Sequence, residues 1–167
     1  MDKRKLAEKV AWSLHGLPYI WGGDDPVSGF DCSGLCIEIL KSVGILPRSG
    51  DWTAQGLFSH FEPQRVNVPG LGCLVFFKKT YAHAIHHVEF CLDSQISMGA
   101  SGGGSQTGVQ PRLPPNPTEM DRINFKLDRL LWLSGDSATR HNAYTKVRPF
   151  VSRDDLYAFV DPFQRAT

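Results

Sequence analysis

The stretch of residues 19–34 constrains this chain more than any other part of it. It reads YIWGG, then a polar turn, then FDCSG, and an apolar helical pattern follows it directly. Cys32 therefore stands at a turn just before a helix, where unpaired backbone amides and the positive end of the helix favour a thiolate over a thiol. We take Cys32 as the first candidate for a nucleophile.

The length and the charge of the chain indicate how many domains it forms and what kind of partner it binds. Its 167 residues fit one domain of ordinary size, and we expect residues 1–167 to form that single domain. With 18 basic and 17 acidic residues the formal net charge is +1, so no electrostatic footprint points to nucleic acid or an acidic membrane as the partner. A partner that is small or of mixed charge is expected instead.

Cysteine usage and the first residues indicate the compartment. The four cysteines, at positions 32, 36, 73 and 91, lack the dense spacing of a disulfide framework, so reduced thiols are expected. The N-terminal residues are charged and then amphipathic, with no apolar stretch or cleavage site, and no later run approaches the ~20 apolar residues that span a bilayer. We expect a soluble protein without a signal peptide, made in the cytoplasm.

Hydrophobic periodicity predicts an α+β domain. Apolar residues at helical spacing indicate helices over residues 5–14, 33–43 and 119–133. β-type runs indicate strands over residues 72–77, 87–92, 95–100, 144–151 and 156–160. Residues 88–92 and 96–100 are expected to pair as an antiparallel hairpin. The stretch 101–117 is rich in Gly, Ser, Gln and Pro and is interpreted as a surface loop.

Three histidines, at positions 83, 86 and 87, supply candidates for the base that a cysteine nucleophile needs. Imidazole suits this role because its pKa lies near working pH and it can hold the thiolate as an ion pair. His87 opens a predicted strand and would be held on a rigid element. The cluster lacks the carboxylate or the helical i, i+4 spacing of familiar zinc sites, so neither a metal nor a cofactor is expected.

These residues resemble a known family, the NlpC-type cell-wall cysteine peptidases. The resemblance spans roughly residues 5–101, and the matching positions keep the order and spacing of the family, which is far more specific than a lone motif. The matching residues are Tyr19, Trp21, Gly22, Gly23, Gly29, Asp31, Cys32, Ser33, Gly34, Leu35, Leu46, Pro47, Arg48, Gln55, Gly72, Leu74, Val75, Phe76, Phe77, His87 and Val88.

The resemblance implies a papain-like α+β fold, with N-terminal helices packed on a central antiparallel sheet. It makes Cys32 the nucleophile and His87 the base, and it places Tyr19 at the site, where it helps to position the substrate or the oxyanion. The backbone amide of Cys32, at a helix start, would be the natural oxyanion donor. Family members cleave amide bonds in peptidoglycan stem peptides, typically between D-glutamate and a diamino acid, so the implied reaction is acyl transfer to water through a thioester.

Three further residues are candidates for binding the substrate. Asp31 and Ser33 flank the nucleophile in the FDCSG segment. Arg48 could bind a substrate carboxylate or could equally be an ordinary surface or structural residue. The expected partner is thus a peptidoglycan peptide.

The chain departs from the family pattern at Gly99. Family members usually place a polar residue about twelve positions beyond the catalytic histidine, on the neighbouring strand, where it orients the imidazole. A glycine offers only its backbone carbonyl, so His87 must be oriented by a main-chain oxygen, Ser97, Ser101, Glu89 or water. Of these we rank the main-chain oxygen at Gly99, or Ser101, first.

The region near residues 102–143 exceeds the small family core and is interpreted as a loop and helix insertion. Because it follows the hairpin that should carry the site, we expect it to border the cleft and select the substrate. Trp21 is expected in the core, with Trp52 and Trp132 as candidate cleft walls.

Two other functions stay open at this point. The same thioester could be captured by an amine or alcohol in a thiol acyltransferase or amidase that acts on a non-wall substrate. Alternatively, the loss of the polar residue at position 99 could leave a wall-binding module without catalysis. The compact form and a general likeness to phage members of the family favour a phage or prophage association, with tail or delivery-system proteins as partners and action at the cell wall.

Overall fold

The computed structural model describes residues 2–102, 113–134, 142–151 and 153–164, with the side chains of residues 127–134 left aside. A six-stranded antiparallel sheet has the order β3-β8-β4-β5-β6-β7. Its strands are β3 (Arg65–Val66), β4 (Leu74–Phe77), β5 (His87–Cys91), β6 (Ile96–Ser101), β7 (Tyr144–Pro149) and β8 (Leu156–Val160). A separate two-stranded hairpin is formed by β1 (Asp24–Asp25) and β2 (Gly29–Phe30).

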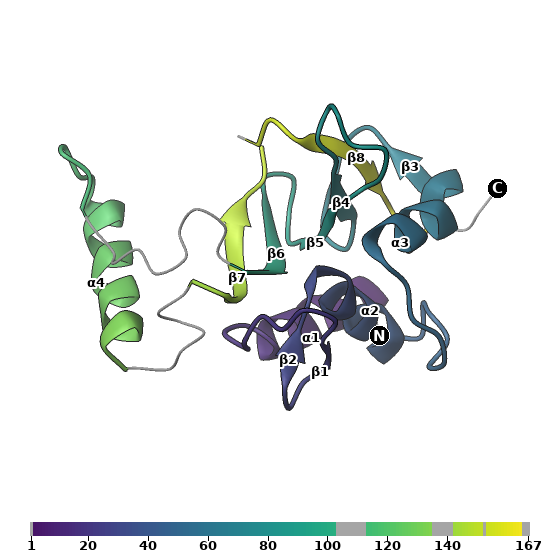
Figure 1. Cartoon of the computed structure of the whole chain (residues 1–167), viewed down its shortest axis with the longest axis horizontal. Coiled ribbons are helices and arrows are strands. Elements are labelled where there is room, and N and C mark those ends of the chain that lie inside the picture. The colour runs from purple at the N-terminus through teal and green to yellow at the C-terminus, as the bar shows by residue number, and fades with distance from the viewer. Residues whose placement is uncertain (1, 103–112, 135–141, 152, 165–167) are drawn as a thin grey trace.

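The helices are α1 (Lys3–Ser13), α2 (Cys32–Ser42), α3 (Ala54–Phe61) and α4 (Glu119–Ser134), with a 3₁₀ turn η1 (Glu62–Gln64) after α3. Figure 1 shows α1 and α2 packed together with the β1–β2 hairpin below the sheet, α3 at the end near β3 and β8, and α4 set apart at the opposite end. The arrangement is α+β, with N-terminal helices against an antiparallel sheet, as the sequence predicts.

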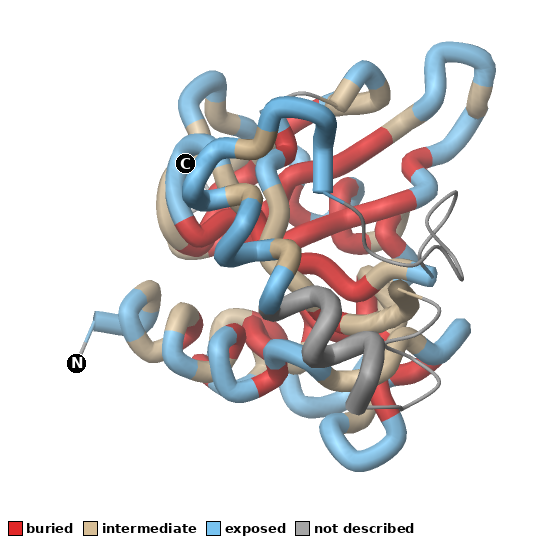
Figure 2. The backbone as a smooth tube through the Cα atoms, turned by 90° about the vertical axis from the view of Figure 1, so that its left-hand side faces the viewer, coloured by how far each residue is buried: buried red, intermediate tan, exposed pale blue. Residues whose placement is uncertain are grey.

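The core forms where α2 meets the middle of the sheet. On this helix Leu35, Ile39 and Leu40 are fully buried. They belong to one cluster with Val88 and Phe90 of β5. Figure 2 shows buried residues following the strands and the helix packed against them. Packing of this kind fixes the start of α2 relative to the start of β5.

Strand β7 is joined to the N-terminal part of the chain as well as to β6. Gly16 N–H donates to the Thr145 carbonyl at 2.8 Å, and Thr145 N–H donates to the Leu17 carbonyl at 2.8 Å. Tyr19 N–H donates to the Ala143 carbonyl at 2.8 Å. The segment after the region 102–143 thus becomes part of the same domain as the loop that leads to Cys32.

Most predicted elements are found within one or two residues of their expected bounds, and β5 and β6 pair as predicted. Helix α3 and the short strands β1, β2 and β3 were not predicted from the sequence. Helix α3 has only eight residues, includes Gly56, and is stabilised by its capping residue Thr53, whose Oγ1 accepts from Gly56 N–H at 3.1 Å. The predicted loop 101–117 lies mostly outside the described residues.

Candidate active site

Cys32 is the first residue of α2, and Asp31 caps that helix. One carboxylate oxygen of Asp31 accepts from Gly34 N–H at 2.8 Å and from the Ser33 hydroxyl at 3.0 Å. The other accepts from Gly22 N–H at 3.2 Å. The first amides of a helix have no partner within the helix, so the N–H of Cys32 is available to a developing oxyanion beside the half-buried thiol.

Close backbone contact holds the loop of residues 22–24 against the start of α2. A Cβ added at Gly34 would lie 2.1 Å from the carbonyl oxygen of Gly23. Only a glycine at position 34 lets the loop pack so closely. The glycines around Cys32 therefore serve the packing of the turn on the helix.

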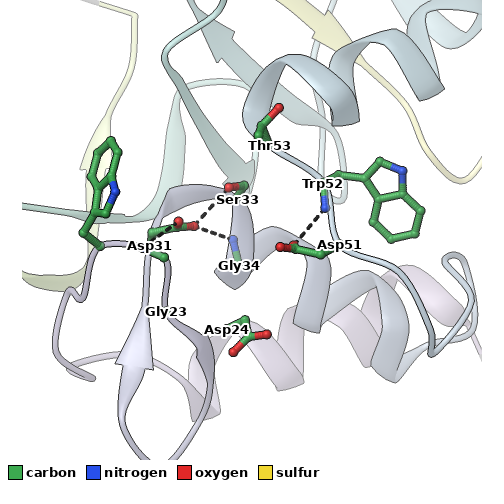
Figure 3. A pocket seen from close by; sticks show the side chains of 10 residues that line it. Gly23, Asp24, Asp31, Ser33, Gly34, Asp51, Trp52 and Thr53 are labelled. Atoms are coloured by element: carbon green, nitrogen blue, oxygen red, sulfur yellow. Dashed lines mark hydrogen bonds between the residues drawn. The ribbon is translucent and has the colours of Figure 1, made fainter.

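A cavity of about 250 Å³ opens beside the start of α2 (Figure 3). Asp24, Asp31 and Asp51 are among the residues that line it, as are Trp21 and Trp52. Trp52 is a wall of this cavity, as expected. The prediction of a core position for Trp21 was wrong, because 88% of its surface is exposed. The turn of Trp21, Gly22 and Gly23 places this side chain at the surface. Trp132 lies among the side chains that are not described.

His87 is the first residue of β5 and lies between Cys32 and a buried carboxylate. Its ring lies close enough to the Cys32 thiol for the thiol to raise the pKa of His87, and its Nε2 lies 2.8 Å from Oε1 of Glu89. Because Nε2 meets the carboxylate, Nδ1 is left for the sulfur. The ring also packs on Phe77, with 5.5 Å between centroids. Cys32, His87 and Glu89 thus lie in one row, the order in which a nucleophile, a base and an orienting group act.

Glu89 is fully buried, and its carboxylate is surrounded by donors. Oε2 accepts from the Ser97 hydroxyl at 2.5 Å. Oε1 accepts from Nε of Arg148 at 2.7 Å and also from Nη2 of the same guanidinium. A second cation, Arg153, places Nη1 3.6 Å from Oε1. A buried charge is tolerated when it is paired and hydrogen-bonded in this way.

The charges of this row set its protonation. Burial raises the pKa of Glu89, but the hydrogen bond and charge of His87 and the charge of Arg148 outweigh it, so the pKa lies well below its ordinary value. Burial lowers the pKa of His87, but hydrogen bonds to Cys32 and Glu89, together with their negative charges, leave it above the ordinary 6.5. Glu89 is an anion at working pH, and it favours the imidazolium.

The orienting group differs from those that we ranked first in the sequence. Glu89, named after the Gly99 main-chain oxygen and Ser101, holds the imidazole hydrogen bond. The Ser101 hydroxyl instead accepts from Nη1 of Arg148 at 3.2 Å. The sequence contained a signal for Glu89, because residues i and i+2 of a strand share a face. Arg148 was missed, since nothing in the spacing of the chain relates it to residue 87.

The remaining predicted residues lie around Cys32 in different settings. Tyr19 is half-buried; burial first, and then the charges of Cys32 and Asp31, raise its pKa. Ser33 is buried with its hydroxyl on Asp31. Arg48 is exposed in the segment between α2 and α3.

Two features are absent from the described part of the chain. No group of three or more His, Cys, Asp or Glu side chains there could hold a metal ion. Among the same residues, no helix is long and apolar enough to cross a membrane.

The sequence profile of the NlpC/P60 family matches residues 16–117. The chain is 36% identical over 112 residues to the bifunctional muramidase/DL-endopeptidase CwlT of Bacillus subtilis, which covers 66% of this chain and 32% of that protein. It is 38% identical over 76 residues to the gamma-DL-glutamyl hydrolase of B. subtilis, covering 43% of this chain and 17% of the relative. The chain therefore spans a third or less of these curated relatives.

Solved structures agree on the fold. An NlpC/P60 family protein from Bacillus cereus has a TM-score of 0.62 at 18% identity, covering 96% of this chain and 40% of its own. The NlpC/p60 domain of the peptidoglycan hydrolase SagA has a TM-score of 0.54 at 18% identity, covering 95% of this chain and 97% of its own. The papain-like arrangement extends over nearly all of the molecule.

Proposed function

The chain belongs to the NlpC/P60 family, and we propose that it is a cysteine endopeptidase that hydrolyses amide bonds of peptidoglycan stem peptides. The observation that carries this proposal is the contact between Cys32, at the capped start of α2, and the His87 ring. The bond assigned is the one between D-glutamate and a diamino acid. The names of the relatives support it, since they include a DL-endopeptidase and a gamma-DL-glutamyl hydrolase.

The geometry supports acyl transfer in two stages. The Cys32 sulfur, paired with protonated His87, attacks the amide carbonyl, and the N–H of Cys32 stabilises the oxyanion that forms. His87 then gives its proton to the leaving amine as the C–N bond breaks, leaving a thioester on Cys32. Water, deprotonated by His87, attacks the thioester and releases the acid with the free thiol.

Substrate binding is assigned to the residues around Cys32 and to the cavity at the start of α2, which is lined by Asp31 and Ser33 on either side of Cys32 but not by Cys32 or His87. Tyr19 also lies close to Cys32, whose charge raises its pKa. Arg48, which is exposed in the segment between α2 and α3, is the candidate for binding a carboxylate of the peptide. Asp31 already caps α2, so any substrate contact would add to a structural role.

The wall-binding alternative loses its basis in this geometry. It rested on Gly99, which provides no side chain to orient the base. Glu89, whose carboxylate lies 2.8 Å from the imidazole, is proposed for that role and argues against this alternative. The acyltransferase alternative differs only in the acceptor, and no contact in the site favours an amine or alcohol over water.

The region 102–143 is proposed to border the cleft, as an insertion in the single domain. Both of its ends contact Tyr19. A Cβ at Gly102 would lie 3.3 Å from the Tyr19 ring, and the Ala143 carbonyl accepts from Tyr19 N–H. Deleting residues 105–117 should change which stem peptides are cleaved. Unchanged preference would contradict this role. The phage or prophage association stays a prediction that rests on family likeness.

The test of the proposed function uses purified muropeptides and mass spectrometry. The wild-type protein should produce a new amine and acid pair, and Cys32→Ala should lower the rate by about 10⁴-fold or more, because triad nucleophiles contribute on that scale. His60→Ala, which alters an exposed histidine on α3, is the matched control for His87→Ala. Equal cleavage by wild type and Cys32→Ala would remove the thiol from the mechanism.

A further inference from the structure

We propose that Glu89 is the positioning residue for His87, and that Gly99, which has no side chain, leaves the space that the Glu89 carboxylate occupies. This inference deepens the proposed function and rests on it. Phe90 pairs with Met98 in the antiparallel register, so Glu89 and Gly99 face each other across β5 and β6. The orienting side chain thus comes from β5, the strand that also carries His87. The neighbouring strand β6 has a glycine at the facing position.

The space between the two strands admits only one side chain. A Cβ built at Gly99 would lie 2.5 Å from Cγ of Glu89, 2.6 Å from Cδ and 2.8 Å from Oε1. All three distances are below the 3.0 Å that real Cβ contacts respect. The Glu89 side chain is confined by Ser97 and Arg148 and cannot swing away. The Glu89 carboxylate can therefore take this position only if residue 99 is a glycine, so the two positions are coupled.

Arg148 keeps the carboxylate charged and aimed. Its guanidinium bonds Oε1 from one side while Nε2 of His87 meets the same oxygen. In the register of β6 and β7, Arg148 pairs with Ser97, the donor to Oε2. Arg148 lies beyond residues 16–117, so the C-terminal strands complete a site whose nucleophile and base lie within the family match.

An anion in this place has a consequence that a neutral amide would not have. A carboxylate stabilises the imidazolium, so the base keeps its proton to higher pH. Arg148 acts in the opposite sense, because its Nη2 lies 3.0 Å from Nε2 of His87. Five described groups near the ring are charged or titratable. They are Cys32 at the start of α2, Glu89 on β5, His86 just before β5, Arg148 on β7 and Arg153, which follows β7 in the chain.

The first test measures the protonation of His87 directly, by NMR titration of its ring in wild type, Glu89→Gln and Arg148→Gln. Glu89→Gln should move the titration to lower pH, and Arg148→Gln should move it to higher pH. A purely structural loss of the network would move both in the same direction and would overturn the proposal. Glu62→Gln and Arg122→Gln alter exposed residues of the same types and serve as matched controls.

The second test measures cleavage. Glu89→Gln should lower kcat roughly tenfold to a hundredfold with little change in KM, since acid–base catalysis is worth about 10²–10⁴-fold. The alkaline limb of its pH profile should move to lower pH. An unchanged kcat with an unchanged alkaline limb would overturn the proposal.

The third test exchanges the two positions and remains decisive if Glu89→Gln does not fold. Gly99→Asn alone should lose activity, because its side chain collides with Glu89. Glu89→Ala with Gly99→Asn should be at least tenfold more active than Glu89→Ala alone, because the amide can then reach the imidazole. A double variant no better than Glu89→Ala would overturn the proposal. If wild type cleaves no muropeptide while the NMR shifts appear as stated, the proposed function fails and the positioning role stands.

Discussion

Cys32 and His87 meet in one site, but different kinds of interaction hold them there. On the cysteine side, defined by residues 19–34, the contacts are local: Asp31 caps α2, and the loop of Gly23 packs on the backbone of Gly34. On the histidine side, formed by β5, β6 and β7, a buried carboxylate is held by charges far apart in the chain, such as Arg148. The first arrangement relies on backbone geometry, and the second on charge balance.

Because different interactions hold the two sides of the site, different changes should destabilise them. Backbone packing and capping should respond to added atoms and lost hydrogen bonds, with little dependence on pH. A buried charge cluster should respond to the loss of any one partner and to pH, because an unpaired buried charge is costly. Variants on the two sides should therefore fail in different ways.

The largest loss of stability is expected from Gly34→Ala on the cysteine side. Its methyl group would lie 2.1 Å from the carbonyl of Gly23, so the loop must move, at a cost of about 3 kcal/mol. Urea unfolding measures the change. Gly70→Ala, where a Cβ meets nothing within 4 Å, is the matched control. Equal stability of the two variants would show that the loop does not depend on this contact.

Arg148→Met tests the histidine side and should cost about 2 kcal/mol. Removing one partner of a buried pair typically costs about 3–5 kcal/mol, and we expect less here because the Arg148 side chain is 25% exposed and Arg153 remains near Glu89. Urea unfolding with Arg122→Met as control measures the difference. A variant as stable as its control would mean that Arg148 is not needed to hold the carboxylate.

Asp31→Ala should cost about 1 kcal/mol, the usual contribution of a helix cap. Asp2→Ala removes the cap of α1 and should cost a similar amount. Thermal unfolding compares the two. Only Asp31→Ala should also slow muropeptide cleavage, because only α2 begins with the nucleophile. Similar cleavage by both variants would argue against a link between this cap and catalysis.

The smallest effect is the dependence of stability on pH through His87. Its pKa is raised on folding, so its contribution is fully present below about 6.5 and is lost as pH rises through the folded value. The melting temperature of wild type should exceed that of His87→Gln by more at pH 5.5 than at pH 9.5. His60→Gln, at an exposed histidine of α3, is the matched control. A difference that grows with pH would contradict the direction of the shift.

The same contrast explains what the sequence could predict. Helix α2, its buried face, Cys32 and the strand that starts at His87 follow from local periodicity and from a motif whose residues are close in the chain. Glu89 could be named because it shares a strand face with His87, but its rank depended on free space at Gly99. That space is a property of packing, and sequence patterns do not report it.

Other misses have the same origin. Arg148 reaches Glu89 across two strand pairings, so its role depends on the sheet order and register rather than on spacing. Trp21 is exposed on its turn, where a sequence pattern of an aromatic residue beside glycines does not report burial. Helix α3 is too short for periodicity to reveal it, and its stability comes from packing of Leu57 and Phe58 in the core.

The measurement that tests the account most directly is the rate of iodoacetamide alkylation of Cys32 between pH 5 and pH 9, in wild type and His87→Ala. Cys36, Cys73 and Cys91 are buried, so the label reports on Cys32, and peptide mass spectrometry verifies its position. At pH 6, Cys32 of the wild type should react roughly tenfold faster than Cys32 of His87→Ala, or more, because the imidazolium stabilises the thiolate. Identical rates across this range would show that the two residues form no functional pair.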